Sequence, residues 1–259
     1  MVDIRYYVTA DVHGYFTELK TALINAGFFE DTEPHKLIIC GDLFDRGNEA
    51  LQLQEFLLDL MDKDQLILIR GNHEDLAMDL LNDWENGSYL RKFNHDNGTI
   101  DTVCQLTGIS LGQLILSSEC AKNAFSMTPY VQTLIPNMVD YFETESYIFT
   151  HGWIPCWCIK NDNSTPYIPF AEWRTAPKPM WIGARWRNGM EAAHYGIIEP
   201  SKTIVCGHWN CSFGHCHYEN DGGEFDNNPN FNPYYGDGII ALDACTPISG
   251  KVNCITIVD

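Results

Sequence analysis

Residues 36–47 decide the fold, and they read Lys-Leu-Ile-Ile-Cys-Gly-Asp-Leu-Phe-Asp-Arg-Gly. The positions before Gly41 are mostly apolar and favour a short strand that is buried on both faces. Asp42, Asp45 and Arg46 follow this strand almost at once. A buried strand that ends in charged side chains is typical of a site at the carboxyl edge of a parallel sheet.

The segments around this strand repeat the same pattern. Apolar runs at Ile4–Thr9 and Gln65–Ile69 predict one strand before it and one after it. Between these strands, Tyr15–Ala26 and Ala50–Met61 place apolar residues at the spacing of a helix face. The order is therefore β-α-β-α-β, which predicts parallel strands joined by right-handed crossovers and an α/β fold.

After the third strand, residues 75–145 are expected to form a mostly helical insertion over the site. One helix is predicted over Asp75–Lys92. The polar stretch Phe93–Thr144 that follows is broken by turn residues. Asn161–Pro179 and Glu219–Asp237 are rich in turn-forming residues and predict long surface loops. Further strands are predicted at Ser146–Thr150, Thr203–Cys206, Gly238–Asp243 and Val252–Val258. Without repeats or a dividing linker, residues 1–259 are predicted to form a single domain.

Composition narrows the classes of partner. The chain has 259 residues, and its 45% hydrophobic content can supply a sizeable core. With 16 basic and 35 acidic residues the net charge is -19, which disfavours binding to nucleic-acid polymers and to anionic membranes. The start resembles no signal peptide and no long apolar run occurs, so we expect a cytoplasmic protein whose ten cysteines are reduced.

Five predicted strand ends carry side chains that bind metals. The carboxyl ends of parallel strands share one crevice, so these side chains are expected to meet. Carboxylate, imidazole and amide groups suit Mn²⁺, Fe²⁺ or Zn²⁺, whereas Mg²⁺ rarely chooses so many imidazoles. Six ligands suit two ions about 3.5 to 4 Å apart that share a carboxylate and hold a water between them. Asp42 is central in the order and is the natural bridge. The six candidates are Asp11, His13, Asp42, Asn72, His151 and His208.

The motifs resemble the phosphoprotein phosphatase branch of the calcineurin-like metallophosphoesterases, which includes serine/threonine phosphatases and diadenosine tetraphosphatases. The five matching segments are 11–14, 41–47, 71–74, 151–152 and 207–208, and residues 243–250 look like the closing segment. The resemblance implies a sandwich of two mixed β-sheets flanked by helices. It also implies two divalent ions, with Mn²⁺ as first choice and Fe²⁺ or Zn²⁺ as alternatives.

The resemblance further assigns a role to each matching residue. Asp11, His13 and Asp42 would hold one ion, and Asp42, Asn72, His151 and His208 the other. His73 would protonate the leaving group, and Asp45 would orient its ring.

Substrate phosphate would be bound by Arg46, Asn72 and a later arginine, for which Arg185 is preferred over Arg187. Trp209 is a candidate substrate contact because it follows His208. An Asn-Gly pair at 97–98 followed by Thr102 looks like a loop that overhangs the site in bacterial members.

Several alternatives stay open. A metal-dependent protein serine/threonine phosphatase, acting on a phosphorylated protein or a small phosphate compound, is preferred over a symmetrical diadenosine tetraphosphate hydrolase. A non-catalytic metal-binding interaction protein and a thiol redox protein built on Cys156 and Cys158 are further alternatives. His35, His95 and His194 are expected to be hydrogen-bonded core residues. The segment 206–217, rich in Cys and His, could instead hold a structural zinc ion.

Overall fold

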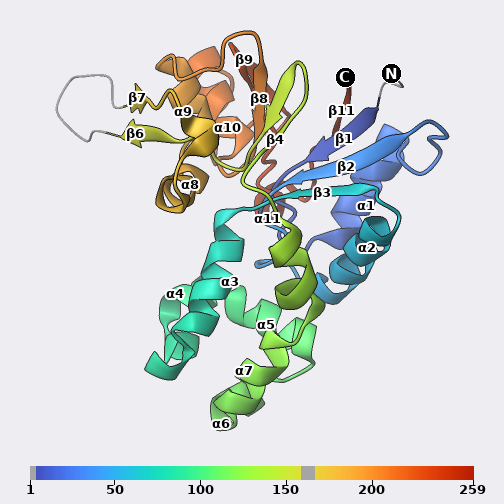
Figure 1. The fold of residues 1–259 in the computed structure, drawn as a ribbon, viewed down its shortest axis with the longest axis vertical. Helices are drawn as coiled ribbons and strands as arrows, with labels where there is room; N and C mark the ends of the chain where they lie inside the picture. The colour runs from blue at the N-terminus through green and yellow to red at the C-terminus, as the bar shows by residue number, and fades with distance from the viewer. Residues whose placement is uncertain (1–3, 159–166) are drawn as a thin grey trace.

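The computed structural model describes residues 4–158 and 167–259, which are built around two mixed β-sheets (Figure 1). The strand order is β11-β1-β2-β3 in the first sheet and β4-β5-β8-β10-β9 in the second. The first sheet contains β1 (Arg5–Thr9), β2 (His35–Cys40), β3 (Leu66–Ile69) and β11 (Ile255–Val258). The second contains β4 (Phe142–Glu143), β5 (Tyr147–Phe149), β8 (Thr203–Cys206), β9 (Tyr234–Gly236) and β10 (Ile239–Ala241). A separate ribbon pairs β6 (Cys156–Cys158) with β7 (Tyr167–Pro169).

Parallel pairing forms the centre of both sheets. β1 pairs with β2 and β2 with β3 in parallel, as β5 does with β8 and β8 with β10. The outer strands β11, β4 and β9 are antiparallel to their neighbours. The predicted β-α-β-α-β unit and all the predicted strands are therefore confirmed, with ends that differ by a few residues at most.

The apolar strands are explained by burial on both faces. Tyr6 and Val8 of β1 point between the sheets and pack with Phe149 and Val205 of the second sheet. Tyr7 lies between them in sequence and packs into the other core, under the helices. The central strands β1 and β2 thus need apolar side chains on both faces, which removes the alternation typical of a half-exposed strand.

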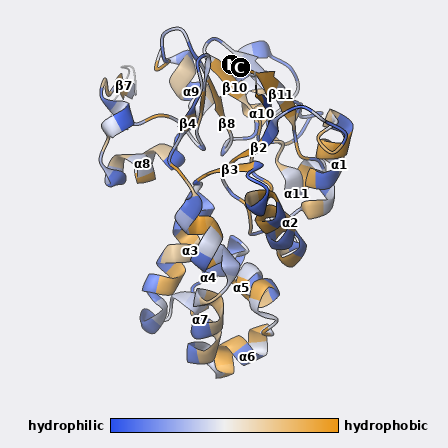
Figure 2. Ribbon diagram, turned by 45° about the vertical axis from the view of Figure 1, so that its right-hand side comes forward, coloured by the Kyte–Doolittle hydropathy of each residue, from blue (hydrophilic) through white to orange (hydrophobic). Residues whose placement is uncertain are grey.

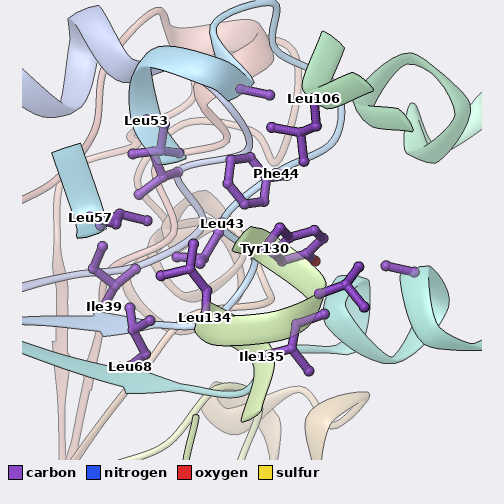
Figure 3. Packing of buried hydrophobic residues seen from close by; sticks show 14 of the residues in the cluster. Ile39, Leu43, Phe44, Leu53, Leu57, Leu68, Leu106, Tyr130, Leu134 and Ile135 are labelled. Atoms are coloured by element: carbon purple, nitrogen blue, oxygen red, sulfur yellow. The ribbon is translucent and has the colours of Figure 1, made fainter. Parts of the chain in front are cut away.

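Helices cover the outer face of each sheet and complete the predicted sandwich. α1 (Phe16–Ala26) and α2 (Ala50–Asp62) pack on the first sheet through one buried cluster, part of which is shown in Figure 3. α8 (Lys178–Arg185) and α9 (Gly189–His194) pack on the second sheet. The shorter helices α10 (Cys211–Gly214) and α11 (Thr246–Ser249) follow β8 and β10.

Helices also fill the chain between β3 and β4, and they lie together below the sheets in Figure 1. The predicted single helix over 75–92 is wrong. The chain turns at Gly87, whose φ of 74° is left-handed, and 3₁₀ turns at Trp84–Asn86 and Ser88–Leu90 replace its second half. Figure 2 shows hydrophilic and hydrophobic residues side by side along these helices. They are α3 (Asn72–Asn82), α4 (Lys92–Asp96), α5 (Thr99–Thr107), α6 (Leu111–Leu116) and α7 (Ser118–Ser126), followed by turns at Tyr130–Leu134 and Ile135–Asn137.

The two predicted loops contain more regular structure than expected. Residues 161–166 of the first loop lie outside the described residues, and the rest contains β7 and a 3₁₀ turn at Trp173–Thr175. The second loop begins at Glu219, the last residue of a π-helical turn, and includes the edge strand β9. Within the described residues, no helix is long and apolar enough to cross a membrane.

Candidate metal centre

The candidate centre lies where strands of both sheets end, and its backbone is strained. Six of its residues have a left-handed backbone, which costs about 1 to 3 kcal/mol each in a residue other than glycine. Such strain persists where the surrounding structure enforces it, and it is commonest at functional sites. The φ values are 51° at Asp11, 50° at His13, 53° at Asp42, 73° at Asp45, 65° at Arg46 and 69° at His208.

Two glycines allow the carboxylates to approach neighbouring loops. A Cβ atom on Gly207 would lie 1.9 Å from Asp11 Oδ2, and one on Gly71 would lie 2.2 Å from Asp42 Oδ1. Both distances are far below van der Waals contact. Only glycine at these positions leaves room for the two aspartates in their present positions.

Asp42 occupies the middle of the centre. Its Oδ2 lies 3.7 Å from His13 Nε2 and 3.9 Å from His73 Nε2, and its Oδ1 lies 3.3 Å from His151 Nε2. Among the described residues, two groups have ligand atoms close enough to hold a metal, and Asp42 belongs to both. One group is His13, Asp42 and His73, and the other is Asp42, His151 and His208.

The hydrogen bonds at Nδ1 of two histidines leave their Nε2 atoms available as metal ligands. His13 Nδ1 lies 2.9 Å from the carbonyl oxygen of Phe44, and His151 Nδ1 lies 2.8 Å from that of Cys40. A carbonyl oxygen only accepts, so Nδ1 carries the proton in both rings. Burial lowers the pKa of both histidines, which keeps them neutral and leaves a lone pair on each Nε2. Both Nε2 atoms lie near oxygens of Asp42, and His151 Nε2 also lies 2.8 Å from Asn72 Oδ1, an arrangement of ligand atoms that a metal ion would stabilise.

Three buried carboxylates lie at or near the centre, and nearby positive charge would stabilise them. Asp11, Asp42 and Asp243 are at most 4% exposed. Burial, together with the neighbouring Asp243 and Asp42 charges, raises the pKa of Asp11 well above its ordinary value. Burial likewise raises the pKa of Asp243 to about 6. Burial would also raise the pKa of Asp42, but the positive charge of His73 opposes burial, and that pKa lies below its usual range. A donor set of this kind fits divalent cations.

His73 is the histidine best placed to carry a proton. Its Nδ1 donates to Asp45 Oδ2 at 2.7 Å, and Arg46 Nη2 lies 3.3 Å from its Nε2. Burial lowers the pKa of His73, but the Asp42 charge and the hydrogen bond with Asp45 outweigh burial and raise it above the ordinary value. His73 and Asp45 are each 3% exposed, whereas Arg46 is exposed to solvent.

Two threonines of α5 hold Asp45. Thr99 Oγ1 donates to Asp45 Oδ2 at 2.9 Å, and Thr102 Oγ1 donates to Asp45 Oδ1 at 2.7 Å. Thr102 Oγ1 also accepts the backbone N–H of Asp45 at 3.0 Å. The helical segment thus contacts the centre directly. The sequence indicated Thr102 only as part of an overhanging loop and gave Thr99 no role.

Sequence reasoning also gave no role to Glu74 or Asp243. The Glu74 carboxylate accepts the backbone N–H groups of Asp42 at 3.1 Å, Leu43 at 2.9 Å and Gly71 at 2.8 Å, which joins the loops after β2 and β3. The sequence signal for Glu74 was its place in the segment 71–74. The sequence signal for Asp243 was its place at the start of the segment 243–250. It was also included in the predicted strand Gly238–Asp243, whereas β10 ends at Ala241.

The structure places the remaining predicted site residues as follows. Arg185 is 4% exposed, and its guanidinium forms ion pairs with Asp75 and Asp140 rather than facing solvent. Arg187 has no carboxylate within 4.0 Å among the described residues. Trp209 lines a pocket that also includes His208. Asn72 Oδ1 lies 2.8 Å from His151 Nε2, at the start of α3.

The histidines and cysteines outside the centre have other partners. His35 and His95 contact backbone oxygens of Glu33 and Tyr89, respectively, whereas His194 is exposed and stacks on Tyr218, so its predicted place in the core is wrong. Cysteine is absent from both groups of candidate ligands found in the described residues, and all ten cysteines are free thiols. In the segment 206–217, Cys211 Sγ contacts the carbonyl oxygen of Ala241 and His215 pairs with Glu219.

Comparisons with known proteins connect these features to a family. The sequence model described as calcineurin-like phosphoesterase matches residues 4–212. Serine/threonine-protein phosphatase 2 of Salmonella typhimurium is 38% identical over 73 residues, which is 28% of this chain and 31% of the relative. The symmetrical bis(5'-nucleosyl)-tetraphosphatase of Buchnera aphidicola is 35% identical over 68 residues, 26% of this chain and 23% of the relative. These matches therefore span less than a third of either relative.

A solved structure is similar over nearly the whole chain. The cold-active protein-tyrosine phosphatase of a psychrophilic Shewanella species has a TM-score of 0.52 and 14% sequence identity, covering 99% of this chain and 77% of that chain. The I115M mutant of a cold-active protein tyrosine phosphatase has a TM-score of 0.53 and 15% identity, covering 99% of this chain and 77% of that one. At this level of identity the similarity concerns the fold alone.

Proposed function

Because the chain belongs to the calcineurin-like phosphoesterase family, we propose that it is a metal-dependent hydrolase of phosphate esters or anhydrides. The observation that carries this proposal is the set of ligand atoms around Asp42, where imidazole nitrogens of His13 and His151 lie 3.7 Å and 3.3 Å from its carboxylate oxygens. Without a cation at this place, the protein would bury a carboxylate and imidazole lone pairs that repel one another, and no interaction would compensate for the cost.

The residues that would hold two divalent ions share Asp42. Asp11, His13 and Asp42 would bind one ion, and Asp42, Asn72, His151 and His208 the other. We add Asp243 as a carboxylate that supports the centre, because it is 4% exposed and its charge acts on Asp11. Two bound ions would lower the pKa of water and stabilise negative charge on the phosphoryl group. Mn²⁺ is the first choice, with Fe²⁺ and Zn²⁺ as alternatives.

The chain's own side chains would handle the proton and the phosphate. His73 would donate a proton to the leaving oxygen from Nε2, because Nδ1 is engaged by Asp45 and the ring's pKa is raised. Arg46 would bind phosphate oxygens through its exposed guanidinium, next to His73 Nε2. A second cation, Arg185 or Arg187, stays a prediction. The ion pairs of Arg185 occupy both its terminal nitrogens, whereas the charge of Arg187 acts on Cys156.

Two substrate classes are supported by different observations. The stretch shared with the Salmonella phosphatase supports activity of the protein serine/threonine phosphatase type, on a phosphorylated protein. A second candidate, hydrolysis of a dinucleoside polyphosphate such as diadenosine tetraphosphate, is favoured by the pocket of aromatic residues beside His208. The acidic chain, with its net charge of -19, has little general attraction for either anion, so binding would depend on the metals and Arg46.

A hydrolysis panel tests the proposal. The protein is assayed with Mn²⁺, Fe²⁺ or Zn²⁺ on p-nitrophenyl phosphate, phosphopeptides and diadenosine tetraphosphate, and metal content is measured in parallel. We expect hydrolysis that requires added metal, and a lower kcat for His73→Asn on substrates with poor leaving groups. A protein that binds metal but hydrolyses nothing would instead be a non-catalytic metal-binding protein. A His73→Asn variant equal to wild type on every substrate would remove His73 as the acid.

A further inference from the structure

A pocket of about 340 Å³ opens directly beside the candidate metal centre. His208 forms part of its wall, and the Trp186 ring packs edge-on against the His208 ring with centroids 5.7 Å apart. The lining residues are Trp186, His208, Trp209, Asn210, Glu224 and Phe225, and we call this site the Trp186–Phe225 pocket. A group bound there would be joined to whatever the metal centre holds.

We propose that the Trp186–Phe225 pocket binds the nucleobase of a phosphate-bearing substrate. This inference rests on the proposed function, since it requires the phosphate to lie at the metal centre. The substrate class would then be a nucleotide or dinucleoside polyphosphate, rather than a phosphorylated serine or threonine side chain.

The aromatic walls supply stacking surface. Trp186 is 47% exposed and Phe225 is 55% exposed, which is unusually open for such large apolar side chains. Trp209 is held by an edge-on contact with Phe213, whose ring centroid lies 5.4 Å away. Flat aromatic ligands can stack on walls of this kind. Every nucleobase presents a π face, so it would gain binding free energy from such stacking.

The polar groups of the pocket distinguish a base from a simple phenyl ring. Asn210 offers an amide, and this side chain makes no hydrogen bond with any other described residue. Glu224 offers a carboxylate that accepts N–H groups, and its loop is fixed where Ser212 Oγ donates to the Glu224 carbonyl oxygen at 2.7 Å. A nucleobase edge presents N–H donors and ring-nitrogen acceptors that match both groups. A tyrosyl ring has neither ring nitrogens nor N–H donors on its edges.

Binding measurements test the pocket separately from catalysis. Tryptophan fluorescence of the Mn²⁺-supplemented protein is titrated with AMP, GMP, ribose 5-phosphate and O-phosphotyrosine. Ribose 5-phosphate keeps the sugar and phosphate but lacks the base. We expect the tighter-bound of the two nucleotides to exceed ribose 5-phosphate in affinity by about 5- to 150-fold, the range for one stacked base.

Matched variants assign the effect to the pocket. Phe225→Ala should bring the ratio of nucleotide to ribose 5-phosphate affinity towards one, and Glu224→Gln should lower the same ratio. Phe93→Ala is the control, because Phe93 is 53% exposed but lies on α4, away from the pocket, and should keep the wild-type ratio.

A wild-type ratio near one would overturn the inference, as would phosphotyrosine binding as tightly as the nucleotides. Failure of the proposed function has a different signature. The protein would then hydrolyse no phosphate compound, p-nitrophenyl phosphate included, with any metal, whatever its nucleotide affinity.

Discussion

The substitution Thr102→Val tests how the helical segment supports the proposed acid. Thr102 is 1% exposed, and its hydroxyl makes two hydrogen bonds to Asp45, one to the carboxylate and one from the backbone N–H. Asp45 in turn holds His73, and its own backbone has a φ of 73°. Valine has nearly the shape of threonine, so the change removes the two hydrogen bonds without opening a cavity.

The expected size of the effect follows from these two bonds. A hydrogen bond to a charged group contributes about 1.5 to 3 kcal/mol, and a buried N–H left without an acceptor costs about 1 to 3 kcal/mol. Because the bonds share one atom and the loop can relax, we expect a loss of about 3 kcal/mol in the free energy of unfolding. Loss of a donor also makes Asp45 a stronger base, so His73 would release its proton less readily. We expect kcat to fall on the order of 10- to 100-fold where the leaving group needs that proton.

The assay compares two substrates in the presence of Mn²⁺. Phenyl phosphate releases phenolate, a poor leaving group that needs a proton. p-Nitrophenyl phosphate releases p-nitrophenolate, which leaves readily without one. Thr102→Val should therefore lose much more kcat on the first than on the second, and Thr102→Ser, which keeps the hydroxyl, should stay close to wild type on both. Equal losses on the two substrates would show that the hydroxyl only stabilises the fold, and no loss on either would refute the positioning role altogether.

Three further predictions concern other parts of the molecule. Gly207→Ala should abolish metal-dependent activity, measured as kcat on p-nitrophenyl phosphate, because its Cβ would lie 1.9 Å from Asp11 Oδ2. Asp243→Asn should weaken Mn²⁺ binding, on the order of 10-fold in calorimetry, by removing one of three buried carboxylates; an unchanged affinity would exclude its support of the centre. The hydrogen bond with Arg174 lowers the pKa of Glu143 from 4.5 to about 2, so the unfolded state takes up protons first as the pH falls. The stability from Glu143 is then present above about pH 4.5 and lost towards pH 2, and Glu143→Gln should flatten the acid side of a plot of melting temperature against pH.

The sequence predicted the central strands well because their apolar character has a simple cause. Residues 37–40 are buried, so this whole segment is apolar whichever register it adopts. The short strands at Phe142–Glu143 and Tyr234–Gly236 were missed, because so few residues show no periodicity and their pairing depends on distant partners. The helix α3 was expected from Asp75, whereas it begins at Asn72 and therefore carries Asn72 and His73 in its first turn.

Residues of the candidate centre were predictable where a strand end and a motif coincide, and not elsewhere. His151 and His208 directly follow apolar runs, and both meet Asp42 in one group of potential ligands. Arg185 shows the limit of this reasoning. Its role depends on Asp75 and Asp140, which lie 110 and 45 residues away in sequence and whose ion pairs with it no local pattern reveals.

Left-handed residues and closely spaced carboxylates in the candidate centre both destabilise the folded state. The position of the centre explains how the protein tolerates them. The left-handed residues Asp11 and Asp42 follow β1 and β2, whose side chains fill the core between the two sheets. That core holds the strand ends in place, so the loops cannot relax without separating the sheets. The same rigidity keeps the carboxylates together against their mutual repulsion. A site that needs close-set negative charges is therefore best built where two packed sheets end side by side, as they do here.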